Sequence, residues 1–72
     1  MNYSWRIEYW LEGGTHIVGK YIGPERNSSD VANKVLAGPP SEFFGMYGEN
    51  ERHNLLVKKG SVIACDISEW RD

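Results

Sequence analysis

Residues 3–11 alternate between apolar and polar side chains with a period of two. The odd positions are all apolar or aromatic, whereas Arg6 and Glu8 occupy even positions. This period predicts a β-strand with one buried face. The pair Gly13-Gly14 follows, and residues 15–22 are again rich in β-branched and aromatic side chains. Because tandem glycines adopt the positive φ angles of a tight turn, the two segments predict a β-hairpin.

The length of the hairpin loop decides which residues share a face. A two-residue loop would place Tyr9 beside Val18, whereas a three-residue loop places Tyr9 beside Ile17 and Trp5 beside Tyr21. We prefer the longer loop, because it collects the apolar residues of both strands on one face: Trp5, Ile7, Tyr9, Leu11, Ile17 and Tyr21. The opposite face then combines charged residues with three apolar ones, namely Trp10, Val18 and Ile22.

A short helix is predicted after the polar run 25–29. Ser28 or Ser29 can accept hydrogen bonds from the free amides at its start, and Gly38 before two prolines is a strong stop. The helix carries one apolar stripe, formed by Val31, Val35 and Leu36. Because so short a helix is unstable alone, this stripe is expected to pack on the sheet.

Three more strands are predicted over residues 42–47, 54–58 and 62–67. The last of them is almost continuously apolar, which is typical of a central strand or of one covered on both faces. Residues 68–72 are expected to form a tail. The chain 1–72 therefore predicts a single α+β domain, in which a twisted antiparallel β-sheet in ββαβββ order carries one short helix.

Composition limits the class of protein. Of the 72 residues, 40% are hydrophobic and 25% are charged, which are globular values that exclude a disordered chain. A chain of this length hides only about 60% of its surface on folding, so its core is thin and a homo-oligomer is expected. The sequence has neither a long apolar run nor the pattern of an export signal, so we expect a cytoplasmic protein without membrane contact.

Residues suited to catalysis or metal binding are few. Cys65 is the single cysteine, so it can form neither an intramolecular disulfide nor a zinc cage. It lies in an apolar strand, where burial raises the pKa of a thiol and makes it inert. His16 and His53 have no second ligand at a diagnostic spacing. The glycines of residues 13–23 punctuate a hairpin and do not precede a helix, as a phosphate cradle requires. We therefore expect no enzyme, no metal and no cofactor.

Aromatic side chains make up 12% of the chain, more than a thin core requires. Phe43 and Phe44 are adjacent, so one of them must point away from the core of a regular strand. Exposed aromatic residues are typical of interfaces. The predicted contact residues are Trp10, His16, Phe44 and Trp70. The alternative, that the helix or the tail covers these side chains within the monomer, is about equally favoured.

The net charge of −2 argues against non-specific nucleic-acid binding, which needs a concentrated basic surface. A basic cluster is nevertheless present at Arg52, His53, Lys58 and Lys59. Acidic residues of the C-terminal segment favour structural salt bridges as its role. The alternative function, nucleic-acid binding, would use Lys20, Arg52, Lys58 and Lys59.

Two segments resemble known motifs. Leu11, Gly14, Ile17 and Gly19 reproduce the Leu-x-x-Gly-x-x-apolar-x-Gly spacing of the first Sm-like motif, and Lys59-Gly60-Ser61-Val62-Ile63 resembles Arg-Gly-x-x-Ile of the second. The resemblance implies an Sm-like or SH3-like small barrel that binds nucleic acid and, for Sm-like proteins, forms rings. The Asp-x-x-Met-Asn element of the family is here replaced by residues 25–29, which removes the usual base-contacting Asn.

The whole chain resembles small proteins of bacteriophages and prophages of Gram-positive bacteria. The likeness lies in the hairpin IEYWLEGGTHIVGKY, the helix SSDVANKVLAG and the closing LLVKKGSVIACDISEW. It implies a compact accessory protein that binds a host factor or host defence system in order to inhibit or redirect it. The expected partners are therefore a host protein or a small ligand, together with further copies of the chain.

Overall fold

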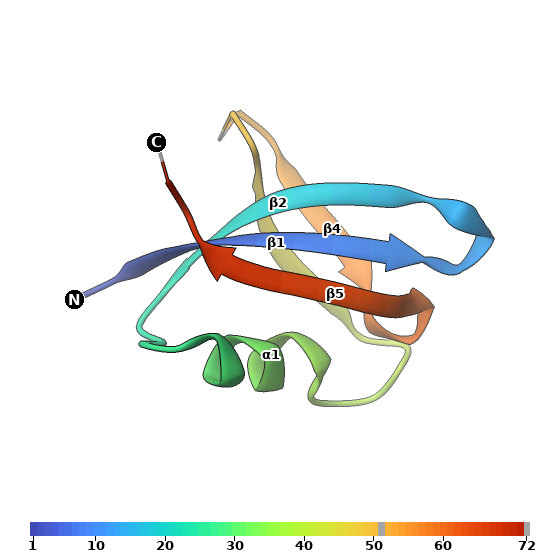
Figure 1. Ribbon diagram of the computed structural model, residues 1–72. Coiled ribbons are helices and arrows are strands. Elements are labelled where there is room, and N and C mark those ends of the chain that lie inside the picture. Colours follow the sequence, from blue (N-terminus) through green and yellow to red (C-terminus); the bar gives the residue numbers. More distant parts are fainter. Residues whose placement is uncertain (51, 72) are drawn as a thin grey trace.

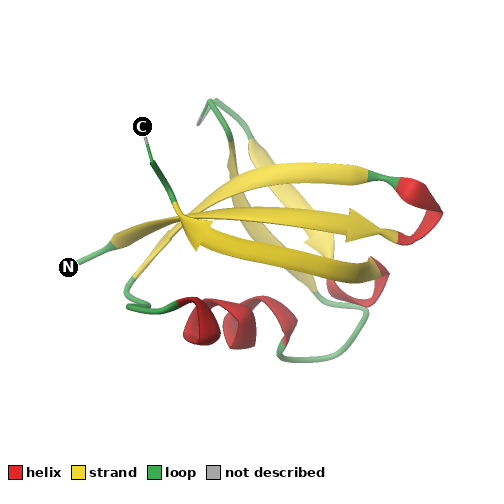
Figure 2. Cartoon of the chain, viewed as in Figure 1, coloured by secondary structure: helices red, strands yellow, loops and turns green. Residues whose placement is uncertain are grey.

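The computed structural model describes residues 1–50 and 52–71 and contains one five-stranded antiparallel sheet and one α-helix. The elements in chain order are β1 (Tyr3–Leu11), the 3-10 helix η1 (Glu12–Gly14), β2 (His16–Gly23), α1 (Ser28–Leu36), β3 (Phe43–Gly48), β4 (Asn54–Lys58), the 3-10 helix η2 (Lys59–Ser61) and β5 (Val62–Glu69). The strand order in the sheet is β4-β3-β2-β1-β5. Figures 1 and 2 show β3 and β4 crossing behind the other strands, with α1 below β5. The α+β class is confirmed, and the two 3-10 helices are additional to the predicted elements.

The first hairpin has the register of a three-residue loop. Tyr9 lies opposite Ile17 and Trp5 opposite Tyr21, as predicted. The loop is η1, whose Gly13 has a φ of 86° that only glycine adopts without strain. The face predicted to be buried is therefore the face that forms the core.

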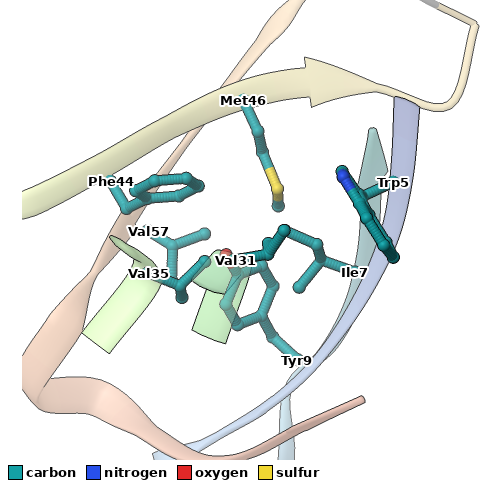
Figure 3. Packing of buried hydrophobic residues seen from close by; sticks show 8 residues of the cluster. All are labelled: Trp5, Ile7, Tyr9, Val31, Val35, Phe44, Met46 and Val57. Carbon is teal, nitrogen blue, oxygen red and sulfur yellow. The ribbon is translucent and has the colours of Figure 1, made fainter. Parts of the chain in front are cut away.

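The core lies between the concave side of the sheet and α1 (Figure 3). Its buried side chains come from β1, α1, β3 and β4: Trp5, Ile7, Tyr9, Val31, Val35, Phe44, Met46 and Val57. Gly19 of β2 has no side chain at this place, and a Cβ there would lie 2.4 Å from Cε of Met46. The glycine therefore lets the Met46 side chain lie directly against the β2 backbone.

The helix begins and packs differently from the prediction in two details. Asn27, not a serine, is the N-cap, and its side chain accepts a hydrogen bond of 2.9 Å from the amide of Asp30. Val31 and Val35 are buried, as expected, but Leu36 is exposed. Val31 and Val35 lie one turn apart on the side of the helix that faces the core, and Leu36 lies beside that side with half of its surface exposed.

The prediction of a central position for the last strand was wrong. Among the described residues β5 pairs with β1 alone, so it lies at one edge of the sheet. The pairing shifts register between Trp10 and Leu11, and Ile63, in the bulge that results, is 68% exposed. The strand also extends through Ser68 and Glu69, which were predicted to belong to the tail. Only its inward side chains contribute to the core, so continuity of apolar residues did not mean cover on both faces.

The helices of the described residues lack the length and apolar content needed to cross a bilayer.

Candidate binding site

A hollow opens in the sheet where β2 and β3 separate. These strands pair only at Gly19–Gly48 and at Lys20–Tyr47. Continued pairing would join Ile22 to Gly45, but that pair does not form. The gap is a cavity of about 340 Å³, which we call the β2–β3 hollow. Its lining residues are Tyr21, Ile22, Gly45, Met46, Tyr47, Asn54 and Leu56.

The backbone of Gly45 faces this hollow. Gly48 donates a hydrogen bond to the carbonyl of His53, and Lys59 donates one to the carbonyl of Glu42. Because bonded and non-bonded pairs alternate along an antiparallel ladder, the even positions of β3 face β4 and the odd positions face β2. The N–H and C=O groups of Gly45 therefore point toward β2 at the level where its ladder has ended. Polar groups of this kind give a mostly apolar pocket its specificity.

The outer surface of β3 and β4 around the hollow carries exposed apolar side chains. Phe43, Tyr47 and Leu56 lie on the outer side of the sheet, because Gly45 lies opposite Leu56 and Phe43 lies opposite Lys58 in the β3–β4 register. Phe43 is 57% exposed and Leu56 is 70% exposed. A Cβ built on Gly45 would touch Leu56 at 3.4 Å, an ordinary contact. The absence of a side chain at Gly45 thus leaves the floor of the hollow open, and is not required by crowding.

The inner wall of the hollow is held by hydrogen bonds. The Tyr21 hydroxyl donates to the Glu25 carboxylate at 2.7 Å, and the Trp5 indole N–H donates to the Glu25 carbonyl at 3.1 Å. The Tyr21 ring also lies 5.4 Å from that of Phe44. Burial, together with the bond to Glu25, raises the pKa of Tyr21 to about 12. The hydroxyl therefore stays protonated and keeps the wall in place at neutral pH.

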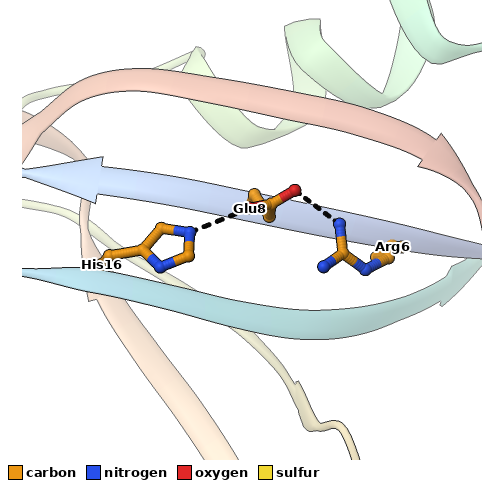
Figure 4. Close-up of polar contacts among 3 residues, drawn as sticks. All are labelled: Arg6, Glu8 and His16. Atoms are coloured by element: carbon orange, nitrogen blue, oxygen red, sulfur yellow. Dashed lines mark hydrogen bonds and ion pairs between the residues drawn. The ribbon is translucent and has the colours of Figure 1, made fainter.

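Trp10 and His16, two of the predicted contact residues, lie side by side at the tip of the first hairpin. Their ring centroids are 5.1 Å apart, and both residues are exposed. His16 contacts Glu8 at 2.9 Å, and Arg6 donates to the same carboxylate at 2.6 Å (Figure 4). Hydrogen bonds from Arg6 and then from His16 lower the pKa of Glu8. This part of the outer face is therefore polar and paired within the chain.

The other two predicted contact residues lie elsewhere. The prediction for Phe44 was wrong, because this side chain is 7% exposed and packs in the core, while its neighbour Phe43 faces outward. Trp70 follows β5 and is partly buried, with the ammonium of Lys20 4.9 Å from its ring centroid. Trp10 and Trp70 flank opposite ends of β1, so the four predicted residues do not form one surface.

The residues of the nucleic-acid alternative are also dispersed. Lys20 lies over the Trp70 ring, Arg52 lies in the turn between β3 and β4, and Lys58 lies at the opposite end of that hairpin. The Lys59 side chain is only 9% exposed and contacts the Ala37 carbonyl and, at 3.2 Å, the Glu42 carboxylate. Its place in the contact set was wrong, because it anchors the end of α1 to η2. The four cations thus form no common basic patch.

Sequence reasoning missed Gly45, Tyr47, Leu56 and Ile22 as members of a site. The segment 43–48 holds aromatic or apolar residues on both of its faces, so alternation alone does not say which face is buried. The choice depends on Val57 and on α1, which cover the even positions. The local signal was the glycine between two exposed aromatic residues, which marks a place where a ligand or backbone can approach.

Groups suited to covalent or metal chemistry do not gather in the described part of the chain. No three His, Cys, Asp or Glu side chains lie close enough to hold a metal ion there. Burial raises the pKa of the Cys65 thiol, with a smaller contribution from Asp66, so the reactive thiolate is disfavoured near neutral pH. Comparison with family models, curated proteins and solved structures finds no match for this chain.

Proposed function

We propose that this chain is a non-catalytic, cytoplasmic binding protein of the phage accessory type. Its β2–β3 hollow receives an apolar side chain of a host protein, which the chain thereby inhibits or redirects. The observation that carries this proposal is the hollow itself, which is lined by exposed Tyr47 and Leu56 and by the free backbone of Gly45, with exposed Phe43 on the same outer side of β3. None of these three side chains belongs to the buried core.

The exposed apolar side chains around the hollow can contribute binding energy. Full burial of one large apolar side chain contributes about 1.5–3 kcal/mol. Interface energy concentrates in a few such side chains around a pocket at the centre of the contact. Phe43 and Leu56 keep more than half of their surface exposed in the monomer, so a partner can bury both. The hollow, which Leu56 lines, accepts one side chain from the partner, and this sets the register of docking.

Self-association belongs to the same proposal. Among the described residues the core consists of eight buried hydrophobic side chains. Both edge strands, β4 and β5, have one sheet neighbour each among the described residues. A homo-oligomer would cover part of this open surface, and the host partner would compete with it wherever the two interfaces overlap.

The test is affinity capture from a bacterial lysate with four purified proteins. They are the native chain, Leu56→Ser, Gly45→Val and the control Ile63→Ser, which removes an equally exposed apolar side chain from β5. We expect the native chain and Ile63→Ser to retain one host protein, and the other two variants to lose at least about tenfold in its yield. Native mass spectrometry of the eluate gives the stoichiometry. Equal capture by all four proteins would reject the hollow as the binding site.

Nucleic-acid binding through Lys20, Arg52 and Lys58 is the second candidate. Its support is the resemblance of the two glycine-containing segments to Sm-like motifs, while the separation of the cations counts against it. Phosphate contacts release counterions, so such binding must weaken steeply with salt. Oligonucleotide binding that is absent or insensitive to salt would dismiss this candidate.

A further inference from the structure

The free edge of β5 presents unpaired backbone groups. Trp70 donates a hydrogen bond of 3.1 Å to the carbonyl of Ser4, which fixes the alternation along the β1–β5 ladder. The even positions of β5 face β1, so Cys65, Ile67 and Glu69 direct their N–H and C=O groups away from the sheet. Among the described residues no other strand pairs with this edge. Donor and acceptor groups therefore repeat every second residue along an open strand.

A groove runs between this edge and α1, which Figure 1 shows below β5. Its volume is about 460 Å³. The helix contributes Ser28, Ala32 and Leu36, which lie one turn apart on one face, and the strand contributes Ala64, Cys65 and Ile67. Most of these side chains are small or apolar. The β5–α1 groove is thus open and mostly apolar, and it lies against a strand with free hydrogen-bonding groups.

The charge on β5 indicates what the groove prefers. Asp66 lies directly opposite Glu8 on the outer face, and like charges in that position repel each other. Glu8 is bound by Arg6 and His16, whereas Asp66 takes part in none of the described ion pairs. Asp66 would occupy a non-hydrogen-bonded position toward an added antiparallel strand, where facing side chains come closest. Asp66 also interacts with Arg6, whose pKa is raised mainly by its hydrogen bond to Glu8 and only slightly by Asp66. A cation on the added strand would give the Asp66 carboxylate a direct partner.

We propose that the β5–α1 groove binds an extended segment of a partner protein, which adds to the sheet as a strand beside β5. The segment carries Lys or Arg opposite Asp66, and small or apolar residues opposite Cys65 and Ile67 that face the helix. Only an extended backbone matches donors and acceptors with a two-residue repeat, which excludes a helix or a small apolar ligand as the occupant. This surface is separate from the β2–β3 hollow, and the inference does not depend on the proposed function.

The test uses the capped peptide Ser-Thr-Val-Lys-Val-Thr-Ser and two matched controls. One control is N-methylated at both valines, which removes the amides that would bond to Cys65 and Ile67, and the other carries Glu in place of Lys. The readouts are the amide chemical shifts of Cys65 and Ile67 and the protection of the Cys65 thiol from alkylation. We expect the first peptide to move both amides and to slow alkylation, and each control to bind at least about tenfold more weakly.

The variant Asp66→Lys distinguishes recognition of charge from non-specific binding. It lies on an exposed position of the outer face and leaves the groove walls unchanged. We expect this variant to reverse the preference, binding the Glu peptide better than the Lys peptide.

Equal binding of the N-methylated and parent peptides, or no binding of the parent at about 1 mM, would overturn the proposal. Concentration-dependent protection of Cys65 without peptide would overturn it as well, because a second copy would then fill the groove. None of these measurements involves Phe43 or Leu56, so failure here is distinguishable from failure of the proposed function.

Discussion

The outer side of the sheet has two halves of opposite character. Over β1 and β2 it is mainly polar, with Arg6 and His16 bound to the carboxylate of Glu8, and Trp10 is exposed beside them. Over β3 and β4 it is apolar, with Phe43 and Leu56 largely exposed beside a hollow. Both halves cover the same core on their inner side. The difference between them therefore does not arise from folding.

This contrast supports the proposal that the apolar half binds a partner. A polar outer face satisfies its charges within the chain and needs no partner. Exposure of an apolar outer face to water is unfavourable. Surfaces of this kind mark interaction sites. Each half can be tested by comparing an outer residue with its neighbour in the sequence, because the two lie on different sides of the sheet.

The largest expected effect separates Phe44 from Phe43. Phe44→Ala removes a buried ring from the core and should lower the free energy of unfolding by about 3–5 kcal/mol. Phe43→Ala removes an exposed ring and should change that free energy by no more than about 0.5 kcal/mol. Urea denaturation followed by tryptophan fluorescence measures both. If Phe43→Ala destabilised the chain as much as Phe44→Ala, the apolar half would be part of the fold and not a free surface.

A second comparison involves the adjacent residues Lys59 and Lys58. Lys59 joins the Ala37 carbonyl at the end of α1 to the Glu42 carboxylate, so Lys59→Met should lower the free energy of unfolding by about 2 kcal/mol. Lys58 is exposed on the outer face, and Lys58→Met should be nearly neutral. Thermal unfolding of the two variants gives the difference directly. Similar unfolding temperatures for both would mean that the Lys59 contacts add nothing to the docking of the helix.

The sequence predicted the parts of the fold that depend on local pattern. The register of the first hairpin followed from the period of β1 and the spacing of its glycines, and Val31 and Val35 followed from helical spacing. The parts that failed depend on long-range partners. The side of Phe44 is set by Val57 and by the helix, and the edge position of β5 is set by its pairing with β1.

The candidate site was harder to predict than the fold, because it lies where two strands stop pairing. The β2–β3 hollow exists because a ladder ends at Lys20–Tyr47, and no residue pattern records where two strands separate. Trp10 was correctly expected to lie at the surface, but it lies on the polar half. The exposed aromatic that lines the hollow is Tyr47, whereas Phe43, the neighbour of the residue that was chosen, is exposed on the same outer side of β3.

Tyr9 provides a smaller test, on the inner side below the polar half. Its hydroxyl is buried without a hydrogen-bond partner among the described residues, and burial raises its pKa strongly. Tyr9→Phe removes this unsatisfied group and keeps the ring, so it should raise the free energy of unfolding by about 1 kcal/mol. Chemical denaturation of both proteins measures the change. A loss of stability would show that the hydroxyl makes a favourable contact. The part of the core formed by β1 would then be less apolar than the part formed by β3.

The smallest effect concerns the polar half and its dependence on pH. Hydrogen bonds from Arg6 and His16 lower the pKa of Glu8 in the folded chain below its ordinary value near 4.5. The unfolded chain therefore binds a proton first as the pH falls, so this contribution to stability is present above pH 4.5 and is lost below it. Glu8→Gln should remove that part of the pH dependence, whereas Glu12→Gln in the exposed loop should leave it unchanged. Unfolding curves between neutral and acidic pH measure the difference between native chain and variant. Since these groups are open to solvent, the difference should be small and should shrink further in salt. A difference that persisted unchanged into strong acid would mean that Glu8 acts through packing and not through charge, and that the two halves of the outer face differ less than their side chains suggest.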